Sequence, residues 1–116
     1  MIKLGHISLC LLPSVVMCSP DFDEEIRPLL EKHCFSCHGP EKQKGDLRLD
    51  SLDPDIVNGN AGETWHDALD MLNRGEMPPE GDLPLPAGER RLLVAWLTKE
   101  LRLAAEARKN SGSQVV

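Results

Sequence analysis

Two cysteines and a histidine, in the order Cys34-Phe35-Ser36-Cys37-His38, constrain this chain more than any other feature. A Cys-x-x-Cys pair followed at once by histidine is the attachment pattern of a c-type haem. The two thiols can add to the two vinyl groups on one edge of a porphyrin, and the adjacent imidazole can then reach the iron. We therefore expect one haem c, covalently attached through Cys34 and Cys37, with His38 as the proximal iron ligand.

A haem-free use of the cysteine pair is the alternative. A redox dithiol of the thioredoxin type is expected in a βαβ context, whereas this pair follows a helical pattern and precedes a loop rich in Gly, Pro and Lys. A structural zinc site needs four ligands, and no second cysteine pair follows Cys37. The remaining zinc candidates are His33, His38 and His66. A zinc or dithiol module is therefore the less favoured interpretation.

The first eighteen residues have the pattern of an export signal. Lys3 and His6 precede the apolar run 7–17, which is too short to span a bilayer. We expect a signal peptide at 1–18, a single domain at 19–109 and a disordered tail at 110–116. A lipid anchor on Cys18 is the rival interpretation, and only then would the protein be attached to a membrane. Export to the periplasm or beyond suits haem attachment, which in bacteria takes place outside the cytoplasm.

Charge and aromatic content limit the partners and the core. The chain has 13 basic and 19 acidic side chains, and loss of Lys3 with the signal makes the balance one unit more acidic, so nucleic acid is not an expected partner. It contains no Tyr, two Phe and two Trp. A small domain buries little surface, so a haem would supply apolar mass that the core lacks.

Three segments have helical periodicity and predict an all-α fold. In the first, Phe22, Ile26 and Leu30 share a face, and Pro28 predicts a kink or a restart of the helix at Arg27. The second begins with Thr64 as the N-cap of a capping box and ends at Gly75. The third runs from Pro86 to about Lys109, with a buried stripe that includes Leu93, Trp96 and Leu97 and with Arg90, Lys99, Arg102 and Arg108 facing outward.

The irregular stretch 39–60 predicts a loop that lines the pocket. Leu47 and Leu49 alternate with polar residues, so a short extended segment could turn both leucines towards the ring. Trp65 and Trp96 are expected to complete the pocket walls. Arg48 and Trp65 are candidate hydrogen-bond donors to the haem propionates.

Met77 is the best-placed candidate for the second axial ligand, and His66 or an open coordination site are the alternatives. It lies in Gly75-Glu76-Met77-Pro78-Pro79, just after a helix ends, where two prolines stiffen the backbone. Met71 is expected to pack in the core, His33 is tied to the attachment side, and His66 is expected to pair with Asp70 on the surface. Ligation of iron by His38 and Met77 would close both axial positions and favour electron transfer.

These segments together resemble the planctomycete-type cytochrome c module over about residues 22 to 105. The matching motifs are Pro28-Leu29-Leu30, Cys34-Phe35-Ser36-Cys37-His38-Gly39-Pro40, Lys44-Gly45-Asp46-Leu47-Arg48-Leu49-Asp50, Gly75-Glu76-Met77-Pro78-Pro79 and Ala95-Trp96-Leu97. The resemblance implies a small class I cytochrome c-like fold, with three to four helices around one haem, His38 proximal and Met77 distal. In that family the module often heads a larger exported protein, so this chain is either a free-standing carrier or a fragment.

We therefore expect an exported monohaem c-type cytochrome that carries single electrons between redox proteins, and that is a monomer and not an enzyme. One partner could be a larger exported multidomain protein. The alternative is a haem enzyme or ligand sensor in which the distal methionine is displaceable. The sequence does not identify the donor, the acceptor or the pathway.

Overall fold

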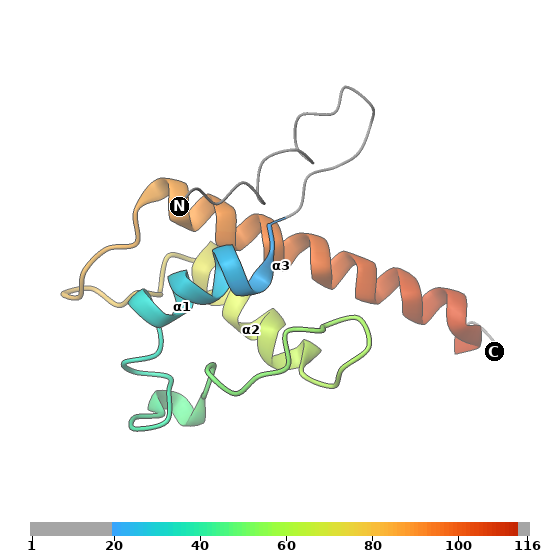
Figure 1. Ribbon diagram of the computed structural model, residues 1–116, viewed down its shortest axis with the longest axis horizontal. Coiled ribbons are helices and arrows are strands. Elements are labelled where there is room, and N and C mark those ends of the chain that lie inside the picture. The colour runs from blue at the N-terminus through green and yellow to red at the C-terminus, as the bar shows by residue number, and fades with distance from the viewer. Residues whose placement is uncertain (1–19, 114–116) are drawn as a thin grey trace, which may run out of the picture.

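The computed structural model describes residues 20–113, and within this range it contains helices and no β-strand (Figure 1). The three α-helices are α1 (Arg27–His33), α2 (Gly62–Asn73) and α3 (Ala87–Arg108). The expected all-α fold is confirmed. The proposed signal peptide and Cys18 lie outside the described residues. None of the described helices is both long enough and apolar enough to cross a membrane.

The first helical segment changes its geometry at the point where the sequence contains proline. A π-helical turn, Phe22–Ile26, begins after Asp21, whose side chain accepts a hydrogen bond from the backbone N–H of Glu24. The α-helical geometry starts at Arg27, with Pro28 in the first turn of α1. Proline is tolerated there because its missing N–H would have no partner within the helix. The predicted restart at Arg27 is confirmed.

Helix α2 starts earlier than the capping pattern predicted. Its N-cap is Ala61, which makes no side-chain cap, so the prediction of Thr64 as N-cap was wrong. The N–H of Trp65 already bonds the carbonyl of Ala61. Thr64 is therefore inside the helix, and burial of Ala61 and Trp65 outweighs the local capping preference.

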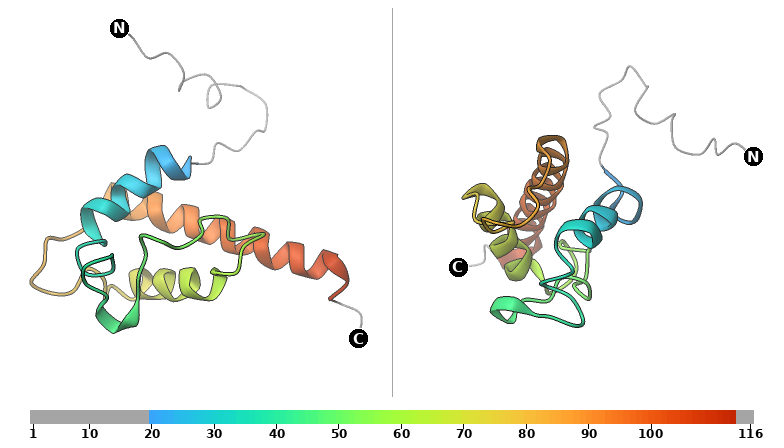
Figure 2. Two further views of the ribbon diagram at one scale, coloured as in Figure 1. Left: turned by 60° about the horizontal axis from the view of Figure 1, so that its bottom comes forward. Right: turned by 90° about the vertical axis from the view of Figure 1, so that its left-hand side faces the viewer.

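Helix α3 forms the base on which the other segments pack. Figure 2 shows α3 beside both the first helical segment and α2, and both pack against it. Their buried side chains form one core: Ile26, Leu30, Ile56, Ala61, Trp65, Leu69, Leu72, Leu85, Leu93, Trp96, Leu97 and Ala104. The chain stays helical after α3 in a π-helical turn, Lys109–Ser113. The tail predicted to be disordered from residue 110 is thus helical as far as Ser113, and residues 114–116 lie outside the described range.

Three of the four aromatic side chains form one cluster that joins the helical segments. The rings of Phe22 and Trp96 have centroids 5.1 Å apart, and Trp65 meets Trp96 edge-on at 5.4 Å. Edge-to-face contacts at such distances are favourable for aromatic rings. The cluster therefore fixes the first helical segment, α2 and α3 relative to one another, and the long segment 34–61 closes around one side of them.

Candidate haem site

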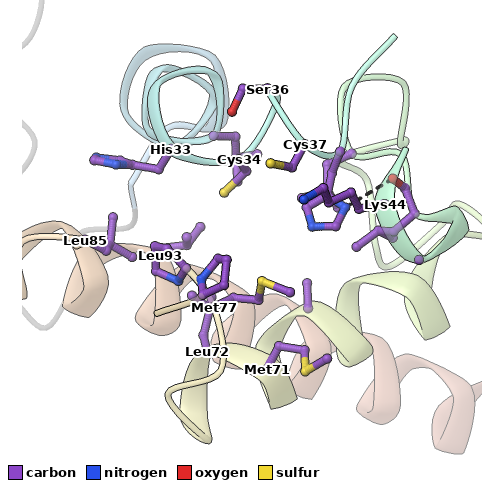
Figure 3. Close-up of a pocket in the computed structure, with 18 of the residues that line it drawn as sticks. His33, Cys34, Ser36, Cys37, Lys44, Met71, Leu72, Met77, Leu85 and Leu93 are labelled. Atoms are coloured by element: carbon purple, nitrogen blue, oxygen red, sulfur yellow. Dashed lines mark hydrogen bonds between the residues drawn. The ribbon is translucent and has the colours of Figure 1, made fainter. Parts of the chain in front are cut away.

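A cavity of about 690 Å³ lies between the turn after α1, the segment 44–49, one face of α2 and the segment 77–85. This volume is in the range of pockets that take organic ligands and cofactors. Figure 3 shows Cys34 and Cys37 on one side of the space, with Met77, Met71 and Leu72 on the opposite side. The cysteine motif and Met77, which lie far apart in the sequence, therefore line the same cavity.

Cys34 and Cys37 are placed by a tight turn that continues from α1. The backbone N–H groups of Cys34 and Phe35 both bond the carbonyl of Leu30, and the N–H of His38 bonds the carbonyl of Cys34. Both thiols are free and half-buried, and both line the cavity. Burial, with the neighbouring Cys37 as a second cause, raises the pKa of Cys34 from 9.0 to about 11. Catalytic dithiols have lowered thiol pKa values, so this environment disfavours the dithiol interpretation.

His38 is buried, with 9% of the residue's surface exposed. Its Nδ1 lies 3.3 Å from the carbonyl oxygen of Leu47, the contact drawn as a dashed line in Figure 3. Because a carbonyl can only accept a hydrogen bond, Nδ1 carries the proton in this contact. The lone pair of Nε2 is then available to a metal, and a histidine ligand is usually oriented by such a second bond.

The loop after the cysteine motif folds back on it and supplies the carbonyl that orients His38. The N–H of Lys44 bonds the carbonyl of Cys37, and the N–H of Leu49 bonds that of His38. The loop turns at Gly39, where any Cβ would collide with the carbonyl oxygen of Phe35. Leu47 and Leu49 both line the cavity, as the alternating pattern predicted.

Met77 and Met71 both line the cavity. Met71 extends from α2, on the face that it shares with Thr64 and Ala68, and is half-buried. Met77 lies beyond Gly75, which has a φ of 73° and ends the helix with the hydrogen bonds of a Schellman motif. Two thioethers thus lie on the side of the cavity opposite the cysteines (Figure 3).

Several residues predicted for the site are used elsewhere. Trp65 lines the cavity, but its indole N–H bonds the carbonyl of Asp53 and so is not free for a propionate. Trp96 is buried in the aromatic cluster and does not line the cavity. Arg48 is exposed, also lies outside the lining, and its guanidinium bonds Asp50 in a bidentate pair that lowers the pKa of that carboxyl.

The other two histidines among the described residues are both paired with acids. His66 is exposed, lies outside the lining, and faces Asp70 at 3.6 Å, as the spacing predicted. His33 lines the cavity, and its Nε2 lies 2.7 Å from Oε1 of Glu89 in α3. Among the described residues, the one group of three His, Cys, Asp or Glu residues whose ligand atoms lie within 4.8 Å of one another is His66, Asp67 and Asp70. This group does not include the cysteines.

Sequence reasoning missed much of the apolar lining. The missed residues come from the inner faces of all three helices and from the segment before α3: Leu30, Ala68, Leu72, Leu83, Leu85, Leu93 and Leu97. For the leucines within the helices, the helical period indicated burial, but a buried stripe has the same pattern whether it faces a cavity or another side chain.

An all-α fold in which a cysteine pair and an oriented histidine face a thioether across an apolar cavity defines the class of c-type cytochromes, and the donor set fits a covalently held haem. The family model described as Planctomycete cytochrome C matches residues 34–81, so this stretch of the chain is similar to that family and the resemblance is confirmed there. Comparisons with curated proteins and with solved structures gave no match.

Proposed function

We propose that this protein is an exported carrier of single electrons. One haem is joined to the thiols of Cys34 and Cys37, His38 Nε2 is the proximal ligand, and the thioether of Met77 is the distal ligand. The observation that carries the proposal is the placement of Met77 opposite the cysteines in one apolar cavity (Figure 3). Bound haem supplies a one-electron iron couple. The protein chain provides the iron ligands and controls how far water can reach the haem.

The residues of the chain favour electron transfer over chemistry at the iron. Leu47 orients His38 through its carbonyl, and the apolar lining excludes water from the ring. A thioether opposite an imidazole leaves no open coordination position and raises the reduction potential relative to two imidazoles. Electron transfer would need no open coordination position, only a redox partner protein docked close to the bound haem.

Met77 is chosen over Met71 because of the backbone that carries it. Met77 is followed by Pro78 and Pro79, whose fixed φ angles stiffen the segment, and both Met77 and Pro78 are half-buried at the cavity. Met71 lies in the last turn of α2, and its neighbours Leu69 and Leu72 are core residues. Methionine commonly fills gaps at such positions.

The sequence of residues 1–18 supports export, and this segment lies outside the described residues. Residues 1–18 have a basic start and an apolar run, and haem attachment to a Cys-x-x-Cys-His motif takes place outside the bacterial cytoplasm. An exported location also requires that the two thiols remain reduced until attachment. Cleavage after residue 18 and the periplasmic location are parts of the same proposal.

The test compares wild type with Met77→Ala and Met71→Ala, each produced in a host that attaches haem. Mass spectrometry in denaturant should show one retained haem in all three proteins. The oxidised wild type should show the weak red absorption band of a sulfur-ligated haem, and its reduced form should bind carbon monoxide slowly at neutral pH. Met77→Ala should lose the band and bind carbon monoxide rapidly, while Met71→Ala should keep both wild-type properties.

Each alternative has its own outcome in this experiment. Loss of the band in Met71→Ala but not in Met77→Ala would assign the distal ligand to Met71. Rapid carbon monoxide binding by the wild type would favour a haem enzyme or a ligand sensor. A periplasmic protein without the added mass would contradict haem attachment and favour the zinc or dithiol module.

A further inference from the structure

Arg90 links three parts of the chain at the edge of the cavity. It lies in the first turns of α3 and is half-buried. Its Nη1 donates a hydrogen bond of 2.8 Å to the carbonyl of Leu72 in the last turn of α2, and its Nη2 donates one of 3.4 Å to the carbonyl of Met77. One guanidinium therefore connects α3, the end of α2 and the backbone of the proposed distal ligand.

The segment from Gly75 to Pro79 has few backbone donors of its own with which to hold Met77. Pro78 and Pro79 have no N–H group, so they cannot tie the segment to the helices by backbone donation. The methionine side chain has three rotatable bonds, so its sulfur stays at a defined place only if its backbone is anchored. The planar, permanently charged guanidinium can supply two donors in fixed directions.

We propose that Arg90 is a positioning residue for the distal ligand. By holding the carbonyls of Leu72 and Met77, it keeps the Met77 thioether over the ring and so makes it harder for an external ligand to replace it. The proposal rests on the proposed function, in which Met77 binds the iron. Arg90 itself is not among the residues that line the cavity.

The neighbouring residue shows why the start of α3 is suited to this task. Glu89 bonds His33, the residue immediately before Cys34, at 2.7 Å. Two consecutive side chains of α3 thus reach the two opposite sides of the cavity, one towards the cysteine motif and one towards Met77. A displacement of this turn would change the separation of the two sides.

The experiment measures how tightly imidazole replaces the distal ligand in the oxidised, haem-loaded protein. Arg90→Gln should bind imidazole about tenfold more tightly than wild type, because losing two hydrogen bonds weakens the competing thioether by about 1.4 kcal/mol. Arg90→Lys keeps the charge and can restore one of the two hydrogen bonds, so it should show a smaller increase of about threefold. Arg91→Gln is the matched control, since Arg91 is exposed and no hydrogen bond to a described residue is seen for it; its imidazole affinity should stay within twofold of wild type.

The outcomes separate the two proposals. If Met77→Ala loses the red band but Arg90→Gln binds imidazole no more tightly than Arg91→Gln, Arg90 has only a structural role and this inference is wrong. If Met77→Ala keeps the band, the ligand assignment fails and the role of Arg90 fails with it. If Arg90→Gln does not fold, Arg90→Lys decides: unchanged affinity contradicts the proposal, and the intermediate increase supports it. A urea unfolding curve for each variant identifies general loosening, which would lower the midpoint without a selective change in imidazole binding.

Discussion

At the scale of single residues, Cys34 shows how burial controls the chemistry of the attachment motif. Its thiol is half-buried beside Cys37, and its pKa is raised to about 11. The attacking species in disulfide formation is the thiolate, so a protonated thiol reacts slowly. Attack by Cys34 on a disulfide is therefore slow while this thiol stays buried.

Alkylation of the haem-free, reduced chain tests this effect. We expect the rate of iodoacetamide addition to Cys34 to keep rising until about pH 11, and to be roughly a hundredfold below that of an ordinary thiol at neutral pH. In urea, where burial is lost, the rate should level off near the ordinary pKa of 9.0. Peptide mapping by mass spectrometry measures the rate at this cysteine, and coincident pH profiles for the folded and unfolded chains would contradict the effect.

The same shift predicts how the stability of the haem-free chain depends on pH. The pKa of Cys34 is higher in the folded state than in the unfolded state, so the folded state retains the proton more tightly. Its contribution to the free energy of unfolding is complete below about pH 9 and declines as the pH rises from 9 to 11. Alkaline solutions should therefore destabilise the haem-free chain before haem is attached.

At the scale of secondary-structure elements, the end of α2 determines where Met77 lies. Gly75 has a φ of 73°, its N–H bonds the carbonyl of Leu72, and the N–H of Glu76 bonds that of Met71. This pairing satisfies carbonyls that the helix end would leave open. The chain then reaches the cavity at Met77, so the position of this proposed ligand depends on how the helix ends.

Substituting Gly75 tests the importance of this helix end. Gly75→Ala should lower the free energy of unfolding by about 1 kcal/mol, because a Cβ disfavours the left-handed conformation even where space is open. Gly62→Ala is the matched control within the same helix, since its Cβ would meet only Ile56 at an ordinary 3.9 Å. It should be neutral or stabilise the helix by up to about 1 kcal/mol. Urea unfolding followed by circular dichroism measures both, and equal losses would argue against the role of Gly75.

At the scale of the whole molecule, a thin core surrounds a large cavity. The described chain has one hydrophobic core, and the cavity of about 690 Å³ is bounded by members of that core, including Leu30, Trp65 and Leu97. A folded chain that leaves such a space unfilled loses contacts on every wall. The haem is thus expected to complete the core as well as to carry the electron.

Removal of the haem should therefore weaken the entire fold. Wild type made without haem attachment, and Cys34→Ser/Cys37→Ser, should both unfold about 3 kcal/mol or more below the haem-loaded protein, because the buried ring contributes apolar area comparable to several core side chains. The two haem-free proteins control for each other, since one keeps the cysteines. Thermal and urea unfolding measure the difference; stability equal to that of the loaded protein would contradict it.

Local patterns were sufficient for the features that depend on neighbouring residues. The Cys34 to His38 spacing, the restart at Arg27 and the end of α2 at Gly75 each follow from the covalent or steric properties of a few adjacent residues. The helical periods likewise predicted an all-α fold. They did not predict the start of α2, where tertiary burial of Ala61 and Trp65 prevailed over a capping sequence.

Long-range packing decided the rest. Trp96 and Arg48 were predicted near the haem, yet the first completes an aromatic cluster and the second bonds Asp50. Arg90 was predicted to face solvent, but it bonds carbonyls 18 and 13 residues away in the sequence. The sequence by itself determined which residues can attach and ligate a haem, because those properties are chemical and local. Only the tertiary structure decided which of them share a cavity, because a side chain's partners depend on elements that meet in space.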